Sequence, residues 1–382
     1  MRVVIFIGHH KVGSTSLQDY FARNAALFAS RGILYPYTNF DGAASLVDDL
    51  LKTTTLDTRK KTPNIPVPKF LESHVPINIR EPHNALAFSM LSDAHEHWRV
   101  PRFHREVPDT HQMMHSIRQQ VEFLKPHTVV LISEVMANFG AELPEGIAQI
   151  KDLFDKADFT VYASLRRIDQ YIASWHGQRL WFGAQLRPLR KDGLKDHIDS
   201  IHFDYTLMVE KWIEKIPEAK LILRDYSDAL ENGGSVKDFL QSCRIKVPPK
   251  AKSDRRVNDS YHRALYEIVR LANIEFPRMR AHNFRTNLQN RQSALKLPKS
   301  DDIELFGRRV RRRLFSKFKP INKALGKHMD RRVFFNARKE ILKPAKIPEL
   351  EAVNIAIEQL QQNIDWFGDP KVQKFVANLQ HY

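Results

Sequence analysis

The sequence contains almost no cysteine, which excludes two kinds of stabilising site. Cys243 is the single cysteine among 382 residues. It excludes a disulfide within the chain and any metal cluster built on several cysteine ligands. Because Cys243 follows Phe239 and Leu240 in a segment that we expect to be helical, we predict a buried structural thiol.

Long apolar runs are also missing. No stretch approaches the roughly 20 apolar residues that a membrane-spanning helix needs. The first apolar run begins at Val3, which leaves no room for the basic and apolar regions of a secretory signal peptide. We therefore expect a cytoplasmic protein, whose contact with a membrane is at most peripheral.

Acidic residues are fewer than basic ones. The chain has 44 Asp and Glu against 60 Lys and Arg, a net charge of +16. Its hydrophobic content of 42% and charged content of 27% are typical of a soluble globular protein with a large core. The excess of positive charge favours anionic partners, namely nucleotides, acidic glycans, nucleic acids or anionic lipid headgroups.

The first twenty residues have the pattern of an anion-binding loop. Residues 3–7, VVIFI, predict a strand buried on both faces. A loop with two glycines and a lysine follows, and a hydroxyl-rich segment with helical spacing begins at residue 14. Loop amides, the helix dipole and the lysine would then point at one phosphate or sulfate. The residues predicted to bind it are Lys11, Gly13, Ser14, Thr15 and Ser16.

The order of residues in this loop argues against an ATP-hydrolysing P-loop, which reads GxxxxGKS or GxxxxGKT. Gly8 and Gly13 keep that spacing, but Lys11 lies inside the loop and Ser14 takes the place of the motif's lysine. The stretch GHHKVGSTSLQ instead resembles the 5′-phosphosulfate loop of sulfotransferases that use 3′-phosphoadenosine-5′-phosphosulfate (PAPS). It is most similar to the bacterial, carbohydrate-directed branch, in which a GILYP-like segment follows, here residues 32–36. A glycine-rich turn that binds nothing is the simplest alternative.

Four further runs predict strands, at residues 33–35, 128–133, 159–165 and 221–224, with helical segments between them. This alternation predicts an α/β fold, a three-layer sandwich around a mostly parallel sheet. The resemblance implies a P-loop-like sulfotransferase fold with helical C-terminal additions. Because ligands bind beyond the carboxyl ends of parallel strands, Lys11, Glu134 and the pair Arg166 and Arg167 should converge there.

The resemblance implies roles for two residues after the third long strand. Arg167 ends that strand and Ser174 lies about two turns into the next helix, as in the 3′-phosphate-binding element of sulfotransferases. An arginine fork and a hydroxyl suit phosphate oxygens. Taken alone, an arginine pair at a strand end is usually a solvated surface pair. The family also uses a late basic loop, for which Arg255 and Arg256 are candidates.

The reaction implied is transfer of a sulfuryl group from PAPS to a hydroxyl of a carbohydrate or related acceptor. Lys11 would stabilise the leaving 5′-phosphate. Glu134 is the predicted base, in the place of a strand-end glutamate of the carbohydrate-directed branch. We expect Lys11 and Arg167 to favour its ionised form. The alternatives are His9 or His10 as base, with Glu134 a purely structural partner of the two cations.

No metal is required for this chemistry, and no convincing metal motif is present. His83, His95 and His97 lie close in sequence, but no HExxH spacing accompanies them. Two other functions remain open: a P-loop nucleotide-dependent kinase, and a non-catalytic protein that binds an anionic polymer or a membrane surface.

We predict two domains. Residues 1–275 form the sulfotransferase-like domain, with an irregular insertion at about 52–82, and residues 276–382 form a basic, mainly helical extension. Within 303–346 a basic amphipathic helix could contact an anionic membrane, a nucleic acid or an acidic glycan. Alternatively it packs its apolar stripe on the core and leaves its cations in solvent. The oligomeric state is left open.

Overall fold

The chain folds into two compact units in a computed structural model that describes residues 1–55, 75–104, 106–255 and 261–382. The first unit comprises Met1–Arg166 and Tyr205–Asn258, and the second comprises Arg167–Asp204 and Asp259–Tyr382. Most of the insertion predicted at 52–82, and the nucleotide contact predicted for Arg256, lie outside the described residues.

This division differs from the boundary that we expected near residue 275. Residues 167–204 and 259–275 belong with the C-terminal part of the chain. The reason is packing between segments far apart in sequence: helix α10 (Ile168–Trp181) lies against α14 (Tyr266–Glu275) and α16 (Gly307–Lys327).

The first unit is an α/β structure. Its strands are β1 (Arg2–Phe6), β2 (Ile33–Leu34), β3 (Thr128–Ile132), β4 (Asp158–Leu165) and β5 (Lys220–Asp225). Its helices are α1 (Ser14–Arg23), α2 (Ala25–Ala29), α3 (Phe40–Thr55), α5 (Ile77–Arg80), α6 (Pro82–Ala94), α7 (Thr110–Leu124), α8 (Phe139–Glu142), α9 (Pro144–Asp152), α11 (Tyr205–Lys215), α12 (Tyr226–Glu231) and α13 (Ser235–Ser242), with a 3₁₀ turn at Val135–Asn138. Each strand expected from the sequence is confirmed to within one residue at either end.

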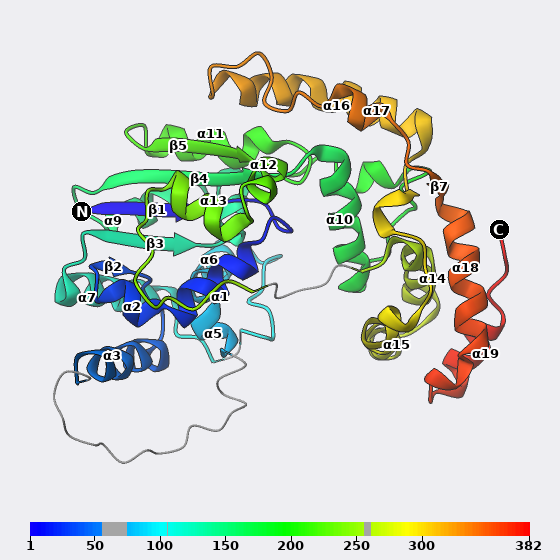
Figure 1. The fold of residues 1–382 in the computed structure, drawn as a ribbon, viewed down its shortest axis with the longest axis horizontal. Helices are drawn as coiled ribbons and strands as arrows, with labels where there is room; N and C mark the ends of the chain where they lie inside the picture. The colour runs from blue at the N-terminus through cyan, green and yellow to red at the C-terminus, as the bar shows by residue number, and fades with distance from the viewer. Residues whose placement is uncertain (56–74, 105, 256–260) are drawn as a thin grey trace. The chain divides into compact units, whose positions relative to one another are not determined.

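The five strands form one sheet in the order β2-β3-β1-β4-β5, and every described pairing in it is parallel. Figure 1 shows β1 between β3 and β4. The chain leaves β1 toward β2 on one side, whereas it leaves β3 toward β4 on the other. Connections that diverge in this way open a crevice at the carboxyl ends of the strands.

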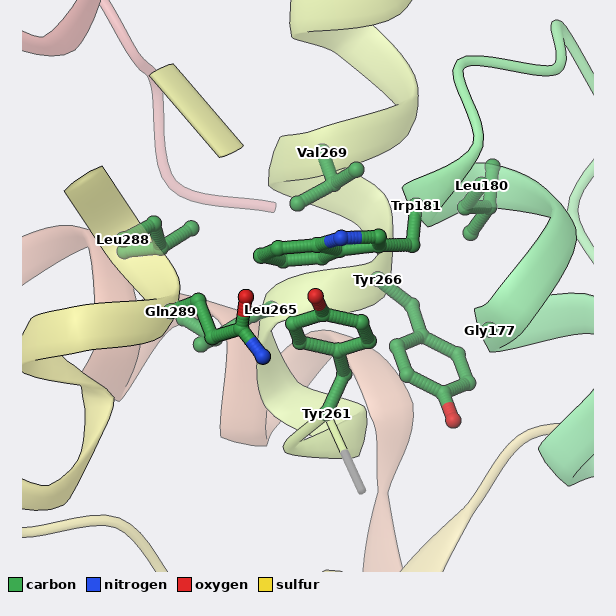
Figure 2. A pocket seen from close by; sticks show the side chains of 9 residues that line it. All are labelled: Gly177, Leu180, Trp181, Tyr261, Leu265, Tyr266, Val269, Leu288 and Gln289. Carbon is green, nitrogen blue, oxygen red and sulfur yellow. The ribbon is translucent and has the colours of Figure 1, made fainter. Parts of the chain in front are cut away.

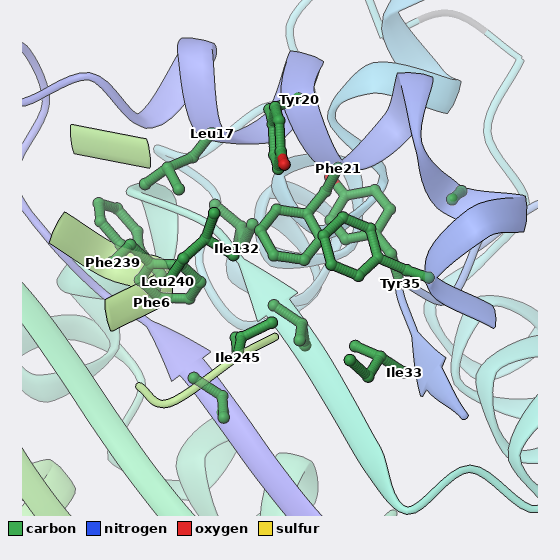
Figure 3. Packing of buried hydrophobic residues seen from close by; sticks show 14 of the residues in the cluster. Phe6, Leu17, Tyr20, Phe21, Ile33, Tyr35, Ile132, Phe239, Leu240 and Ile245 are labelled. Atoms are coloured by element: carbon green, nitrogen blue, oxygen red, sulfur yellow. The ribbon is translucent and has the colours of Figure 1, made fainter. Parts of the chain in front are cut away.

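Both faces of the sheet are buried, which makes the arrangement compatible with a three-layer sandwich. Alternate residues of a strand point to opposite faces. In β1, Val3 and Ile5 point to one face and Val4 and Phe6 to the other, and none is more than 1% exposed. The core on the second face joins the sheet to α1 and α13 (Figure 3). Cys243 belongs to this core, as predicted for a structural thiol.

The second unit is mainly helical. Besides α10, α14 and α16 it contains α15 (Arg278–Arg291), α17 (Arg338–Leu342), α18 (Glu349–Gln362), α19 (Pro370–Ala377), the short parallel strands β6 (Ile303–Glu304) and β7 (Ile347–Pro348), and 3₁₀ turns at Gly193–Asp196, Arg263–Leu265, Gln292–Ala294, Ser300–Asp302 and Ile364–Trp366. None of the helices in the described ranges is both long and apolar enough to cross a membrane.

The basic helix α16 packs its apolar stripe inside this unit. Leu314, Phe318 and Leu325 are at most 1% exposed, and Phe318 contacts Phe203 and Phe335. Most of the cations of α16 lie on the surface. The structure therefore agrees, for the apolar stripe, with the simplest sequence interpretation, in which the stripe meets the protein core.

Candidate active site

The predicted anion loop lies at the centre of the sheet edge. Because β1 pairs with β3 on one side and with β4 on the other, the loop after Phe6 has a strand end on each flank. The backbone N–H of Ser133 donates to the Phe6 carbonyl at 3.1 Å, and that of His9 donates to the Ser164 carbonyl at 3.2 Å. The sheet thus places Glu134 on one side of the loop and Arg166 on the other.

The loop turns sharply through two residues with left-handed backbone conformations. Lys11 has φ 63° and Gly13 has φ 84°. Gly13 is the N-cap of α1, and in the described part of the chain no side chain caps that helix end. The first-turn amides of a helix lack partners within the helix and, with its dipole, attract anions. Ser14 to Ser16 thus present their amides at a predicted phosphate position.

Gly13 is also required by its contact with α13. A Cβ at residue 13 would collide with the side chain of Ser235, whose hydroxyl donates to the Val12 carbonyl at 2.9 Å. We expect Gly13→Ala to lower the free energy of unfolding by roughly 1–3 kcal/mol, because alanine is strained at this φ and meets this clash. Urea denaturation of the intact chain measures the loss.

Gly368→Ala is the matched control for this stability prediction. A Cβ there meets no atom within 4 Å, and Gly368 has no positive φ. Its stability should change by less than about 0.5 kcal/mol. A Gly13→Ala protein as stable as wild type would show that the loop does not have the described conformation.

Lys11 is held close to a second cation. Burial, followed by repulsion from Arg166, lowers the pKa of the Lys11 ammonium. The Arg166 guanidinium donates to the Lys11 carbonyl at 3.5 Å and lies over the Tyr226 ring, 5.5 Å from its centroid. The Arg166 carbonyl accepts a 2.8 Å bond from the Tyr205 hydroxyl. These contacts fix two positive charges at the loop, where an anion would relieve their mutual repulsion.

Glu134 lies against the opposite side of the loop and the first turns of α1. Its carboxylate accepts hydrogen bonds from Gln18 Nε2 and from Asn84 Nδ2, each at 3.2 Å. Its Oε1 is 3.9 Å from Nδ1 of His10. Ser14, at the start of α1, also hydrogen-bonds this carboxylate. The structure therefore brings together three of the predicted residues, Glu134, His10 and Ser14.

A second carboxylate changes the expected ionisation of Glu134. The Asn84 amide also donates to Glu81 at 3.1 Å, so it bridges the two carboxylates. Glu81 in turn accepts from Arg80, with distances of 2.6 and 3.0 Å. Burial first, and repulsion from Glu81 second, raise the pKa of Glu134 to about 7. Our expectation that nearby cations favour the ionised form was wrong, because burial and repulsion from Glu81 outweigh the hydrogen bonds that favour that form.

The two loop histidines have surroundings that differ from those of Glu134. Burial, with a further contribution from Lys11, lowers the pKa of His10 to about 4, so this imidazole is neutral at pH 7 and weakly basic. His9 is 1% exposed and packs edge-to-face on Tyr205, with ring centroids 4.1 Å apart. Compared with His10, Glu134 therefore has the protonation equilibrium better suited to a base near neutral pH.

The predicted 3′-phosphate residues belong to the second unit. Arg167 caps α10 and donates to both carboxylate oxygens of Asp169, at 2.7 and 3.1 Å. Asp169 also pairs with Arg311 of α16 at 3.4 Å. Ser174 is partly exposed on α10, seven residues after Arg167 and so on the same face of the helix.

Of the two arginines predicted to form the late basic loop, the structure describes only Arg255, since Arg256 lies outside the described residues. The Arg255 guanidinium donates to Asp19 of α1 at 3.0 and 3.1 Å. Asp19 is 1% exposed and also pairs with Arg23. Two further bonds, from Arg23 to the Ser253 carbonyl and from the Lys252 amide to Asn24, hold the segment before Arg255 beside the end of α1.

The three histidines considered as metal ligands do not form one cluster. His83 lies under β3, where its Nδ1 accepts from the Ile132 amide at 3.1 Å. His95 and His97 lie near Glu142, with the two rings 5.4 Å apart. In the described ranges, no group of three or more His, Cys, Asp or Glu could hold a metal ion.

Sequence reasoning missed Gln18, Glu81 and Asn84. Gln18 stands one turn after Ser14, so helical spacing could have placed it beside the loop. Glu81 lies at the end of the insertion predicted at about 52–82 and Asn84 lies just after it, and no sequence pattern links these two residues to the end of β3. Arg166 was considered only as a partner of Arg167.

An aromatic pocket in the second unit does not extend the site. Trp181 stacks on Tyr261 with ring centroids 3.1 Å apart, and Val269 and Leu288 also line this pocket (Figure 2). The remaining space is about 10 Å³, room for no more than about one water molecule. The pocket is therefore filled by its own side chains.

Comparison of this chain with family models, curated proteins and solved structures found no match.

Proposed function

We propose that the chain is a sulfotransferase that moves the sulfuryl group of PAPS to a hydroxyl of a carbohydrate or related acceptor. The observation that carries the proposal is the buried carboxylate of Glu134, with a pKa of about 7, set directly against a cationic, helix-capping loop. An anion-binding loop beside a base is what transfer of a charged group to a hydroxyl requires. The P-loop-like sulfotransferase fold is part of this proposal.

Each loop residue has a defined task in the proposed reaction. The amides at the start of α1 and the Lys11 ammonium receive the 5′-phosphosulfate. As the bond from sulfur to the bridging oxygen breaks, negative charge grows on the 5′-phosphate, and Lys11 stabilises it. The lowered pKa of Lys11 eases donation of a proton to that oxygen.

Glu134 activates the acceptor from the other side of the loop. A carboxylate with a pKa of about 7 is partly ionised at neutral pH. It can therefore take the proton of the acceptor hydroxyl as the oxygen attacks sulfur, and then release that proton to solvent. Asn84 and Gln18 orient the carboxylate through their hydrogen bonds. Attack and departure are in line, as in phosphoryl transfer.

Incubation with radiolabelled PAPS and a panel of neutral and acidic glycans tests the proposal. We expect label in a glycan fraction, an equal amount of released adenosine 3′,5′-bisphosphate, and no effect of a metal chelator. Transfer of the γ-phosphate of ATP to the same acceptors, without sulfuryl transfer, would establish the kinase alternative instead. Comparison of neutral with acidic glycans also tests whether the exposed cations of α16 help to bind an acidic acceptor.

Arg167→Ala should weaken binding of the 3′-phosphorylated nucleotide selectively. Loss of one charge-assisted contact costs about 1.5–3 kcal/mol, so affinity for adenosine 3′,5′-bisphosphate should fall roughly 10- to 150-fold. Affinity for adenosine 5′-phosphate should stay within about twofold, because it lacks the 3′-phosphate. Calorimetric titration with both nucleotides measures the difference.

Arg187→Ala is the control for Arg167→Ala, since it removes another arginine of the same unit from an ion pair, that with Asp196. It should change neither affinity. Equal weakening of both nucleotides by Arg167→Ala would mean that Arg167 does not recognise the 3′-phosphate.

A further inference from the structure

The first unit has a cationic groove at the edge of the sheet opposite to the anion loop. It has a volume of about 600 Å³ and lies at the amino ends of β1, β2 and β3, near the N-terminus in Figure 1. Since a strand rises about 3.3 Å per residue, roughly 20 Å separate Arg2 from Gly8 along β1. The groove is thus distinct from the site described above. Its lining includes Arg2, Arg31, Arg244, Lys246, Ile33 and Pro248.

The walls of the groove are fixed by hydrogen bonds. Arg2 NH1 donates to the Cys243 carbonyl at 2.8 Å, which joins β1 to the segment after α13. His127 Nε2 bonds the Arg31 carbonyl at 2.9 Å, and its Nδ1 bonds Thr128 Oγ1 at 2.9 Å. Because a carbonyl only accepts, Nε2 carries the proton and the Thr128 hydroxyl donates to Nδ1. The groove is therefore preformed.

The positive charges of the groove lack carboxylate partners among the residues that the structure describes. None of the described residues that line the groove is acidic. In the ranges that the structure describes, no ion pair involves the side chains of Arg31, Arg244 or Lys246. All three residues are exposed at the rim, whereas Arg2 is half-buried at the base. A cleft lined by charges of one sign concentrates the electrostatic field and attracts counter-ions.

Part of the lining of the groove is apolar. Ile33 is 4% exposed at the base, and Val247, which is 54% exposed, stands beside Pro248 and Pro249. Apolar walls with a few placed charges are typical of small-molecule sites, whose volumes run from about 300 to 1,000 Å³. This groove combines an apolar wall and a few charges with a volume inside that range.

We propose that the groove binds a small organic polyanion of nucleotide size, in which two or more phosphate or sulfate charges meet the arginines and a ring packs on Val247 and Pro248. A small molecule is favoured over a nucleic acid or a membrane, because the charges converge on a bounded cavity that also has an apolar wall. An extended polyanion would use an open row of cations instead.

Calorimetric titration with ADP and with inorganic pyrophosphate tests the site. The titrations use the intact chain carrying Lys11→Ala, so that the anion loop contributes little. We expect ADP to bind more tightly than pyrophosphate, since only ADP offers a ring to the apolar wall. In the same background, Arg31→Ala with Arg244→Ala should weaken ADP binding at least about tenfold, through loss of two charge-assisted contacts.

The matched control replaces two exposed arginines of the second unit, Arg308 and Arg312, by alanine, and makes the same change in net charge. It should leave ADP binding unchanged. Hydrogen exchange of the backbone amides locates the bound ADP. ADP should protect peptides that contain residues 244–249 from exchange, and not only those that contain residues 8–16. Unchanged affinity in the Arg31 and Arg244 double variant, protection confined to the loop, or binding of a duplex oligonucleotide but not of ADP would each overturn the proposal.

Discussion

Replacement of Glu134 by glutamine should lower turnover by roughly 10²- to 10⁴-fold, the usual contribution of a positioned base. Binding of the donor nucleotide should stay near wild type, because glutamine keeps the shape of the side chain and one of the two oxygens that accept from Asn84 and Gln18. Steady-state kinetics with PAPS, together with titration of adenosine 3′,5′-bisphosphate, separates the two effects. Glu142→Gln, on a half-exposed carboxylate, is the control and should change neither quantity.

The pH dependence provides a second readout for Glu134. A base acts in its ionised form, so kcat/KM of the wild type should rise through pH of about 7, and this rise should vanish in Glu134→Gln.

The free energy of unfolding should depend on Glu134 in the opposite direction, falling where kcat/KM rises. Because the folded-state pKa lies above the ordinary value of 4.5, the folded state holds this proton more tightly. Stability from this group is therefore lost as pH rises from about 4.5 to about 7, and the variant should not show that loss.

Two outcomes would contradict a base role for Glu134. If turnover survives in Glu134→Gln, the base is elsewhere, and His9→Ala or His10→Ala should show the loss instead. If nucleotide binding collapses together with turnover, Glu134 stabilises the loop through Ser14 and Gln18 and has a structural role.

Lys11→Ala should reduce transfer by about a hundredfold or more, since lost stabilisation of the leaving group costs on the order of 3 kcal/mol. Folding should be intact, because the side chain is only partly buried. The variant also has a readout that does not depend on activity. Lys11 contributes to the low pKa of His10, so that pKa should rise when the ammonium is removed, which NMR titration measures.

Lys151→Ala is the matched control for Lys11→Ala. Lys151 forms a surface ion pair with Glu218, and its loss should leave turnover unchanged. Near wild-type turnover in Lys11→Ala, with the His10 pKa shifted as expected, would show that the lysine is at the loop but takes no part in the reaction.

The local part of the site could be predicted from the sequence because it depends on neighbouring residues. An apolar run followed by a glycine loop and a helix start specifies a strand, a turn and a helix. Strand β1 lies within one residue of its predicted bounds, and α1 begins at residue 14 as predicted. Placement of Glu134 followed from one further rule, that strands of a parallel sheet share an edge at their carboxyl ends.

The parts that were missed depend on contacts between distant segments. Glu81 and Asn84 reach Glu134 across about 50 residues, and they reverse the expected direction of its pKa shift. The sequence pattern suggested that Arg311 is a surface cation, but its exposed fraction is 7% and it pairs with Asp169 and Glu304. Periodicity predicted that α16 has an apolar stripe, and it could not say that Phe203 and Phe335 cover it.

Calorimetric titration of the intact chain, first with a metal chelator and then with Mg²⁺ in its place, tests the sulfotransferase assignment most directly. The ligands are adenosine 3′,5′-bisphosphate, ATP and a duplex oligonucleotide. We expect that the bisphosphate binds most tightly, that its binding needs no metal, and that Lys11→Ala weakens it. ATP binding that requires added Mg²⁺, with no measurable binding of the bisphosphate, would contradict the sulfotransferase assignment and support the kinase alternative.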